Sequence, residues 1–280
     1  MLEIGSNEFH IFGHLLSPYG IAMSVSIVFQ ALYLDWEKKR ERLRSDYLFV
    51  TWLIVVVSSI IGARLVYVLT DLPYFLKNPL AVFNVTAGGL VLYGGFLLGP
   101  FAGYWYTRRV GANYWYTFDL AVTPLALTII FVRLGCFFNG CCFGSPTSLL
   151  WVAVYREGTT PYAFYGEKVP IHPTQVYESL AGLLLTLVLH FVPEKKKPFH
   201  GFKTLLFMTL YPIFRFIIEF FRGDAYRGRL GPFSTSQWIS IGFLVFVAVM
   251  YPILSKINKV GKVQTVPESF LLESNQRRKA

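Results

Sequence analysis

Arginine residues occur inside apolar segments of this sequence, where a positive charge is costly. Arg133 lies in the apolar run 115–138, and Arg215 lies in a second run, 202–221. A charged side chain at membrane depth usually belongs to a functional site, because burying it without an anionic partner costs several kcal/mol. The planar guanidinium group can bind a phosphate through two parallel hydrogen bonds. The arginines therefore indicate a site for a phosphate-bearing molecule.

The run 202–221 and the residue that follows it place polar side chains on one helical face. Positions i, i+4, i+8 and i+11 of a helix lie within about 80° of one another, and here they are Tyr211, Arg215, Glu219 and Arg222. A purely structural ion pair between Arg215 and Glu219 is the simpler interpretation. However, two arginines face one glutamate, and Arg64 and Arg133 add positive charge. We therefore predict an excess of positive charge that a lipid phosphate would neutralise.

Two glycine pairs, Gly88-Gly89 and Gly94-Gly95, lie on either side of Tyr93 in a further apolar segment. Paired glycines allow helices to pack closely. Alternatively, they bring the backbone close to a ligand, toward which Tyr93 would direct its hydroxyl group. The spacing alone does not choose between the two interpretations.

The three cysteines form a C-x4-C-C pattern at Cys136, Cys141 and Cys142. A zinc site usually has four ligands at a recognisable spacing, and only His172 could supply a fourth here. We therefore predict no metal, and nothing in the sequence indicates a cofactor. A disulfide between Cys136 and one of the other two is an alternative if the segment lies outside the cytoplasm. A packing role for small side chains is the simplest interpretation.

A polar stretch from His172 to Glu178 overlaps the start of the apolar run 174–192. Its simplest interpretation is a helix start, with Thr174 as the cap and Glu178 near the first turn. His172 is the residue of this stretch that could exchange a proton near neutral pH.

The composition indicates which elements position these residues. Of the 280 residues, 54% are hydrophobic and 15% are charged, whereas soluble globular proteins carry about 25% charged residues. The net charge of +10 comes from short lysine and arginine clusters between apolar runs. This pattern orients membrane helices and differs from the basic face of a nucleic-acid-binding protein. We therefore predict contact with a lipid bilayer and no nucleic acid.

Seven segments are long and apolar enough to cross a bilayer, which takes about 20 residues; they are 17–34, 47–69, 88–107, 115–138, 174–192, 202–221 and 237–255. The predicted fold class is an all-α polytopic membrane protein with seven transmembrane helices. Residues 1–255 would form a single integral-membrane domain, with a loop at 139–173 inserted between helices four and five. The basic tail 256–280 is predicted to be frayed. The N-terminus lacks the basic region of a cleavable signal peptide.

The distribution of positive charge predicts the orientation. Most lysines and arginines lie in the loops after helices one, three and five and in the tail. The positive-inside rule then places the N-terminus and the 139–173 loop outside and the tail in the cytoplasm. Arg64, Arg133 and Arg215 all fall in the outer half of the membrane.

Five segments, in order along residues 17–240, resemble the bacterial prolipoprotein diacylglyceryl transferases; they are Ser17–Gly20, Gly88–Gly95, Arg133–Gly144, His172–Glu178 and Tyr211–Arg222. The resemblance implies a transferase of the bacterial inner membrane with a periplasmic N-terminus, a cytoplasmic C-terminus and an active site towards the periplasm. It would transfer the diacylglyceryl group of phosphatidylglycerol to the lipobox cysteine of a prolipoprotein signal peptide. A thioether would form and glycerol phosphate would leave.

The resemblance also implies roles for single residues. The phosphate-binding arginines would be Arg133 and Arg215, with Glu219 beside Arg215. Catalytic residues are implied at Tyr93, Arg133, Arg215 and Glu219, and substrate-binding residues at Tyr19, Arg133, Asn139, Gly144, His172, Arg215 and Arg222.

The chain departs from the family pattern at three positions, one of them an implied catalytic residue and two of them near implied site residues. Well-known members carry histidine, asparagine and glutamate where this chain has Tyr93, Cys136 and Cys141. The histidine is proposed to act as a base on the substrate thiol. A tyrosine, with an ordinary pKa near 10, becomes a base only if nearby arginines stabilise the phenolate. His172 is the alternative base.

A second class of function also accommodates an arginine site. A non-catalytic membrane protein could bind or transport a phospholipid without changing it. A transporter would show internal repeats and charges near the midplane of the membrane, and this sequence shows neither. A third interpretation is another phospholipid head-group transferase with a different acceptor.

Overall fold

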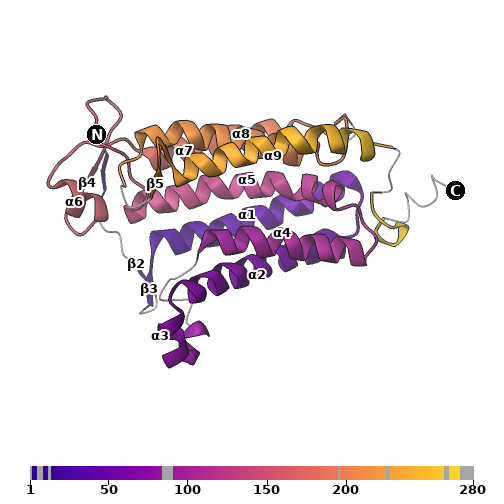
Figure 1. The fold of residues 1–280 in the computed structure, drawn as a ribbon, viewed down its shortest axis with the longest axis horizontal. Helices are drawn as coiled ribbons and strands as arrows, with labels where there is room; N and C mark the ends of the chain where they lie inside the picture. The colour runs from indigo at the N-terminus through magenta and orange to yellow at the C-terminus, as the bar shows by residue number, and fades with distance from the viewer. Residues whose placement is uncertain are drawn as a thin grey trace. The chain divides into compact units, whose positions relative to one another are not determined.

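The chain is mostly helical, as predicted. The computed structural model describes residues 2–4, 9–11, 14–83, 91–194, 196–224, 228–261 and 265–271. The long helices are α1 (Pro18–Glu41), α2 (Ser45–Thr70), α4 (Leu92–Arg109), α5 (Tyr114–Asn139), α7 (Thr174–His190), α8 (Phe202–Ile218) and α9 (Thr235–Ile257) (Figure 1). Each of the seven predicted segments coincides with one of these helices, although residues 84–90 lie outside the described part of the chain.

Within the described part of the chain, four helical segments have the length and hydropathy of membrane spans; they are Tyr47–Thr70, Tyr114–Asn139, Phe202–Phe221 and Thr235–Ile257. Large apolar side chains on these segments face outward, and Leu65, Ile217 and Val249 are each at least 50% exposed. A helix with an apolar outer face is stable when lipid covers that face. The protein is therefore a multi-pass helical membrane protein.

The remaining elements are short. The short helices are α3 (Leu72–Lys77), η1 (Pro79–Phe83), α6 (Thr160–Tyr165), η2 (Glu219–Phe221) and η3 (Glu268–Phe270). Among the described residues, strands occur only as three pairs. Strand β1 (Leu2–Ile4) is parallel to β4 (Ala153–Tyr155). The other two pairs are antiparallel; they are β2 (Phe9–Ile11) with β3 (His14–Leu16), and β5 (Arg229–Leu230) with β6 (Phe233–Ser234). These short pairs connect loop segments and do not form a larger sheet.

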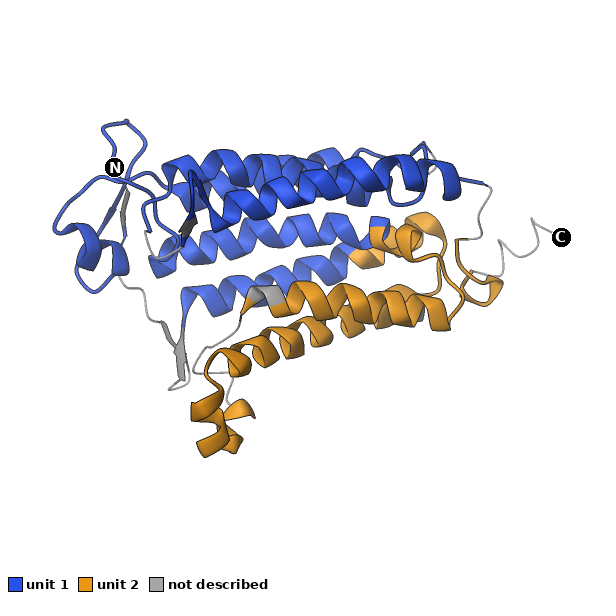
Figure 2. Cartoon of the chain, viewed as in Figure 1, with its two compact units in different colours: residues 1–33, 119–262 blue, residues 34–118, 263–280 orange. Residues whose placement is uncertain are grey.

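The helices group into two compact units, coloured separately in Figure 2. Unit 1 comprises residues 1–33 and 119–262, and unit 2 comprises residues 34–118 and 263–280. Arg133, Arg215 and the three cysteines belong to unit 1, whereas Arg64 and Tyr93 belong to unit 2.

In unit 2, glycines allow α2 and α4 to touch backbone to backbone. A Cβ atom added to Gly94 would lie 2.0 Å from the Gly62 carbonyl oxygen, and one added to Gly62 would lie 2.3 Å from the Gly94 carbonyl oxygen. Gly95 packs against Ser59 in the same interface. The packing interpretation is therefore confirmed for Gly94 and Gly95, while Gly88-Gly89 lies outside the described residues.

Part of the C-terminal tail packs onto unit 2. Leu271 forms a β-bridge with Leu43, and the Arg44 amide donates to the Phe270 carbonyl oxygen at 2.9 Å. The Tyr47 and Phe270 rings lie 4.9 Å apart between centroids. The prediction of a frayed tail is thus wrong for residues 265–271, because apolar residues near the chain end dock beside the start of α2.

The core of unit 1 lies between α5, α7 and α8. Val122 and Ala126 of α5 pack against Leu185 and Leu189 of α7, and Phe207 and Tyr211 of α8 cover them. Gly182 of α7 allows this close contact, because an added Cβ would lie 3.0 Å from side-chain atoms of Ile129. The three helices therefore hold their polar residues in a fixed register.

The 139–173 insertion has its own apolar cluster at the end of α5; its buried members are Ile4, Phe137, Phe143, Ala153, Tyr155 and Ile171. The Tyr155 hydroxyl donates to the Phe137 carbonyl oxygen at 3.0 Å, and the Gln175 side-chain amide donates to the Tyr155 hydroxyl at 3.2 Å. The insertion is therefore anchored both to α5 and to the start of α7.

The opposite end of unit 1 contains a cluster of buried charges, here termed the lysine cluster; its members are Asp119, Glu194, Lys197 and Lys203. Lys197 contacts both Asp119 and Glu194, and Lys203 lies 3.2 Å from Glu194. Their side chains are at most 3% exposed. This cluster joins the start of α5 to the connection between α7 and α8.

Candidate functional site

Arg133 lies about two turns before the end of α5 and is paired with a glutamate of α7. Its Nε atom lies 2.6 Å from Glu178 Oε2. The Arg133 side chain is 17% exposed, and the Glu178 side chain is 3% exposed. Glu178 lies in the second turn of α7, so the polar stretch that begins the helix points a carboxylate at α5.

Two further arginines contact the same carboxylate. Arg222, which follows η2, donates from Nη1 to Glu178 Oε1 at 3.0 Å. Arg215 of α8 brings its Nη1 atom to 3.7 Å from the same oxygen. One buried glutamate therefore lies among three guanidinium groups that come from separate parts of unit 1.

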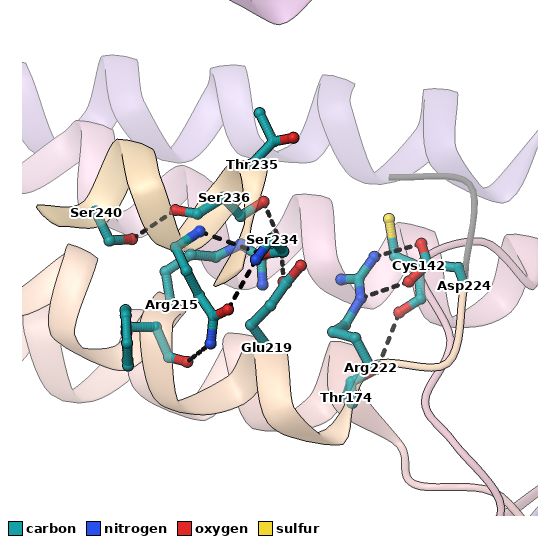
Figure 3. A network of polar contacts seen from close by, with 12 residues as sticks. Cys142, Thr174, Arg215, Glu219, Arg222, Asp224, Ser234, Thr235, Ser236 and Ser240 are labelled. Carbon is teal, nitrogen blue, oxygen red and sulfur yellow. Dashed lines mark hydrogen bonds and ion pairs between the residues drawn. The ribbon is translucent and has the colours of Figure 1, made fainter. Parts of the chain in front are cut away.

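Arg215 and Arg222 also have carboxylate partners of their own. Arg215 Nη2 lies 2.6 Å from Glu219 Oε2 and donates to Ser236 Oγ at 3.1 Å. Arg222 donates to both oxygens of Asp224, at 2.9 and 2.7 Å. Figure 3 shows both pairs, with Ser236 beside Arg215 and Cys142 near Arg222. We term the whole group the arginine cluster; it consists of Arg133, Arg215, Arg222, Glu178, Glu219 and Asp224.

The arginine cluster is formally neutral, which corrects the predicted excess of positive charge. Three guanidinium groups meet three carboxylates, because Glu178 and Asp224 are partners that the sequence analysis did not assign. Arg64 belongs to unit 2, where it donates to the carbonyl oxygens of Ala81 and Val82 at 2.6 and 2.8 Å. The available signal was the carboxylate of Glu178 in a polar stretch just before an apolar run.

Although charge is balanced, hydrogen-bond donors exceed acceptors in the cluster. Each guanidinium carries five N–H groups and no acceptor, so three of them offer more donors than three carboxylates can accept at close range. Arg215 Nη1 is buried and has no hydrogen-bond acceptor among the described residues. This group can therefore donate to an added oxyanion without first losing a hydrogen bond.

The loop after α5 brings Arg222 into the cluster. Gly144 forms a β-bridge with Arg222, and the Ser145 amide donates to the Phe221 carbonyl oxygen at 2.9 Å. A Cβ atom at Gly144 would lie 2.3 Å from the His172 carbonyl oxygen. Only glycine fits where these three backbone segments cross, so Gly144 positions Arg222 and His172.

The structure also places three other predicted substrate-binding residues, His172, Asn139 and Tyr19. His172 Nδ1 lies 3.2 Å from the Tyr177 hydroxyl, and its ring centroid lies 5.1 Å from that of Phe221. Burial lowers the pKa of the His172 imidazole below its ordinary value, because desolvation disfavours the charged form. Asn139 ends α5 with an exposed side chain. Tyr19, 37% exposed, lies where α1 packs against Gly135.

Tyr93 occupies the first turn of α4 in unit 2. Its side chain lies outside the described residues, so its predicted catalytic role stays a prediction.

Cys136, Cys141 and Cys142 are thiols in the structure, with no disulfide among them. Their sulfur atoms all lie within 4.8 Å of one another. Arg133 Nη1 lies 3.6 Å from the Cys142 sulfur. The cysteines therefore adjoin the arginine cluster, a proximity that their spacing in the sequence did not reveal.

Together, the fold and the site define a multi-pass membrane protein with a buried cluster of arginines and carboxylates in unit 1. A family model described as prolipoprotein diacylglyceryl transferase matches residues 7–253. The chain therefore belongs to the prolipoprotein diacylglyceryl transferase family, as its sequence motifs indicated.

Curated relatives support the family over nearly the whole chain. A phosphatidylglycerol–prolipoprotein diacylglyceryl transferase of Clostridium tetani is 30% identical over 86% of this chain and 94% of its own length. Relatives with the same name in Clostridioides difficile and Pseudomonas fluorescens are 32% and 31% identical, over 90% and 86% of this chain. The matched regions span 96% and 85% of the lengths of these two relatives.

Proposed function

We propose that this protein transfers the diacylglyceryl group from phosphatidylglycerol to the cysteine thiol of prolipoproteins. Membership of the transferase family carries this proposal, and the arginine cluster supports it with a site for a phosphate. The reaction forms a thioether and releases glycerol phosphate, which is the first step in lipoprotein maturation. The protein is an enzyme of lipoprotein biosynthesis.

The reaction requires a thiolate nucleophile and a phosphate leaving group. The sulfur attacks the glyceryl carbon that carries the phosphate ester, and the carbon–oxygen bond breaks. The oxygen keeps the electron pair and leaves on glycerol phosphate, which also takes up the thiol proton. Donors that are already in position stabilise charge as it develops on such a leaving group, and guanidinium groups do so without transferring a proton.

Arg133 and Arg215 are the proposed phosphate-binding residues. Both are near Glu178, at 2.6 and 3.7 Å, so an oxyanion beside Glu178 would meet both guanidinium forks. Arg215 offers Nη1, which has no acceptor among the described residues. Because Glu178 also contacts Arg222, we propose that it holds the three guanidinium groups apart when no phosphate is bound.

The remaining roles are assigned in the same proposal. Glu219 would orient Arg215 through their 2.6 Å contact, and Gly144 would place Arg222 and His172. His172 or Tyr93 would accept the thiol proton and pass it to the departing glycerol phosphate. Asn139 and Tyr19 would line the entry to the site for the lipobox peptide.

We further propose that seven helices span the bacterial inner membrane, with the N-terminus and the 139–173 insertion in the periplasm and residues 256–280 in the cytoplasm. The asymmetric distribution of lysine and arginine supports this orientation. In this arrangement residues 1–255 act as one catalytic domain whose site opens toward the outer leaflet. Phosphatidylglycerol and an anchored signal peptide would both reach it from the bilayer.

Incubation of the purified protein with phosphatidylglycerol and a lipobox peptide tests the function. Mass spectrometry should show a diacylglyceryl gain on the peptide cysteine, and none on a matched peptide with serine at that position. A protein that binds phosphatidylglycerol but never modifies the peptide would instead be a lipid-binding or transport protein. Transfer from phosphatidylglycerol to some other acceptor would also contradict the proposal.

A further inference from the structure

The spacing of Cys136 and Cys141 brings their side chains together through the way α5 ends. Gly140 takes a left-handed conformation with φ 70°. Its amide donates to the Phe137 carbonyl oxygen at 3.3 Å, and the Cys141 amide donates to the Cys136 carbonyl oxygen at 3.2 Å. These two bonds are the Schellman pattern of helix termination, which places the residue after the glycine beside the residue five positions earlier.

The third cysteine is turned toward this pair by the start of α7. Cys142 has φ 62°, a left-handed conformation that a residue with a Cβ atom adopts only when its surroundings impose it. The Thr174 hydroxyl donates to the Cys142 carbonyl oxygen at 2.9 Å, and the Gln175 side-chain amide donates to the Cys141 carbonyl oxygen at 2.8 Å. Two buried residues of α7 therefore hold the loop in this conformation.

The three sulfur atoms form a triangle of the size that a zinc ion needs. Zinc binds thiolates at about 2.3 Å, so two sulfurs of a tetrahedral site lie roughly 3.8 Å apart. All three sulfurs here lie within 4.8 Å of one another, and small side-chain rotations would close the triangle. Soft thiolate ligands select zinc or copper(I) over magnesium and calcium.

The surroundings suit a charged site with one open position. A zinc ion with three thiolates carries one net negative charge, and Arg133 Nη1 lies 3.6 Å from the Cys142 sulfur to offset it. Cys136 is buried, whereas Cys141 and Cys142 are only partly buried. The sequence predicts no metal because it offers no fourth ligand, yet a catalytic zinc keeps three protein ligands and leaves the fourth position to water or substrate.

We propose that Cys136, Cys141 and Cys142 bind a zinc ion whose fourth position takes the thiol of the incoming prolipoprotein cysteine. This inference rests on the proposed function. Coordination to zinc deprotonates a thiol, so the ion prepares the nucleophile, and the released proton leaves with glycerol phosphate. Arg133 contacts both the Cys142 sulfur and Glu178. The thiolate and the phosphate would therefore lie on two sides of one guanidinium group.

Metal analysis of the purified full-length protein, reconstituted with equimolar zinc and freed of excess, tests the site directly. We expect one zinc per chain in the wild type and in Thr147→Ala, a control in the same insertion, and none in a variant with all three cysteines changed to serine. Cobalt(II) in place of zinc should give the near-ultraviolet absorption of thiolate–cobalt bonds. Failure to retain zinc would overturn the proposal. Labelling of the thiols only after reduction, which indicates a disulfide, would also overturn it.

Transfer assays with and without a chelator test the role of the ion. We expect removal of zinc to lower transfer at least about 100-fold, with recovery when zinc is restored, because the nucleophile loses its activation. Equal transfer with and without bound zinc would overturn the proposal while the function stands. If neither form transferred lipid from phosphatidylglycerol, the proposed function would fail, and the metal analysis would still decide whether the cysteines bind zinc.

Discussion

The arginine cluster and the lysine cluster each include one residue of α5, Arg133 and Asp119. These two residues are separated by about 21 Å along the helix at 1.5 Å per residue. Both clusters are formally neutral, and both join α5 to the neighbouring α7 and α8 region. They differ in exposure, because no charged side chain of the lysine cluster is more than 3% exposed, whereas that of Arg133 is 17% exposed. This difference separates a cluster that fixes the fold from one that can accept a substrate.

The lysine cluster is fully buried. Asp119 accepts hydrogen bonds from Lys197, from the Gly201 amide and from both the amide and the hydroxyl of Thr204, at 2.6 to 2.8 Å. A carboxylate has about four acceptor positions, so Asp119 is saturated. No member of this cluster has a side chain more than 3% exposed.

The arginine cluster is open by comparison. Its side chains reach 17% exposure at Arg133 and 14% at Asp224. Three guanidinium groups share Glu178. A guanidinium is weakly hydrated and binds oxyanions through two parallel bonds, whereas an ammonium is a compact, strongly hydrated charge. The arginine cluster can therefore exchange a carboxylate contact for a phosphate contact.

The largest expected effect follows removal of a phosphate-binding arginine. Arg133→Ala or Arg215→Ala should reduce lipid transfer by about 1000-fold or more, because a positioned arginine that stabilises a leaving phosphate contributes on this scale. Arg→Lys at either position should recover only part of the loss, because lysine lacks the bidentate fork. Transfer is measured by mass spectrometry of the lipobox peptide.

The control for this pair is Arg108→Ala, which removes an exposed arginine at the end of α4 and should leave transfer unchanged. Each variant must also retain the melting temperature of the wild type within a few degrees in detergent. Wild-type transfer by either Arg133→Ala or Arg215→Ala would contradict the proposed phosphate site.

The lysine cluster should show the opposite result. Asp119→Ala leaves Lys197 buried beside an empty acceptor position, and breaking a buried pair in this way destabilises a protein by about 3–5 kcal/mol. We therefore expect a markedly lower melting temperature, with unchanged transfer per folded molecule. Thermal unfolding in detergent and the transfer assay measure the two quantities.

Asp35→Ala is the matched control, because Asp35 also pairs with two lysines, Lys38 and Lys39, each at 2.6 Å, but on the surface. Exposed ion pairs contribute little to stability, so its melting temperature should stay close to that of the wild type. If Asp119→Ala abolished transfer while the melting temperature held, the lysine cluster would have a functional role and the contrast would fail.

Sequence reasoning identified the helices and the arginines but not their charge balance. The apolar runs predict the helix positions closely, because burial in lipid depends on local composition. Glu178 and Asp224 could not be assigned as partners, since pairing Glu178 with Arg133 requires the register between α5 and α7, and that register depends on contacts such as Gly182 with Ile129. Asp119 and Lys197 were likewise read only as parts of an apolar run and a charged loop.

For the cysteines, the sequence is sufficient to predict one contact but not the other. The grouping of Cys136 with Cys141 follows from a local rule, because Asn139-Gly140 at a helix end favours a Schellman termination. The approach of Cys142 does not follow from a local rule, because it depends on Thr174 and Gln175 from α7. Tertiary contacts, rather than spacing, bring the third thiol beside Arg133.

A smaller effect is expected where the backbone positions the arginine cluster. In Gly144→Ala the new Cβ would lie 2.3 Å from the His172 carbonyl oxygen and 2.9 Å from that of Phe221, so the loop must shift and displace Arg222. We expect transfer to fall about 10-fold, since an ångström-scale misplacement can reduce a rate by that factor or more. Gly242→Ala, where an added Cβ meets no atom within 4 Å, should leave transfer unchanged. Equal rates for both variants would show that the crossing tolerates a methyl group.

The smallest effect concerns the pH dependence of stability at the lysine-cluster end. Burial, assisted by Lys197, lowers the pKa of His200 to about 4, below the ordinary value of about 6.5. Between these values the unfolded chain binds a proton that the folded protein does not, so stability falls as the pH decreases from about 6.5 to about 4. Full stability from this group is present above pH 6.5.

His200→Gln separates this effect from other titrations, because it removes the proton-binding group while keeping a polar side chain of similar length. We expect the wild type to lose about 1–2 kcal/mol more stability than the variant across this pH range, after allowance for solvent relaxation around a loop residue. Melting temperatures in detergent at pH 7, 5.5 and 4 measure the difference. Parallel curves for the two proteins would mean that His200 does not titrate in this window, whereas a steeper wild-type curve would show that His200 takes up a proton on unfolding.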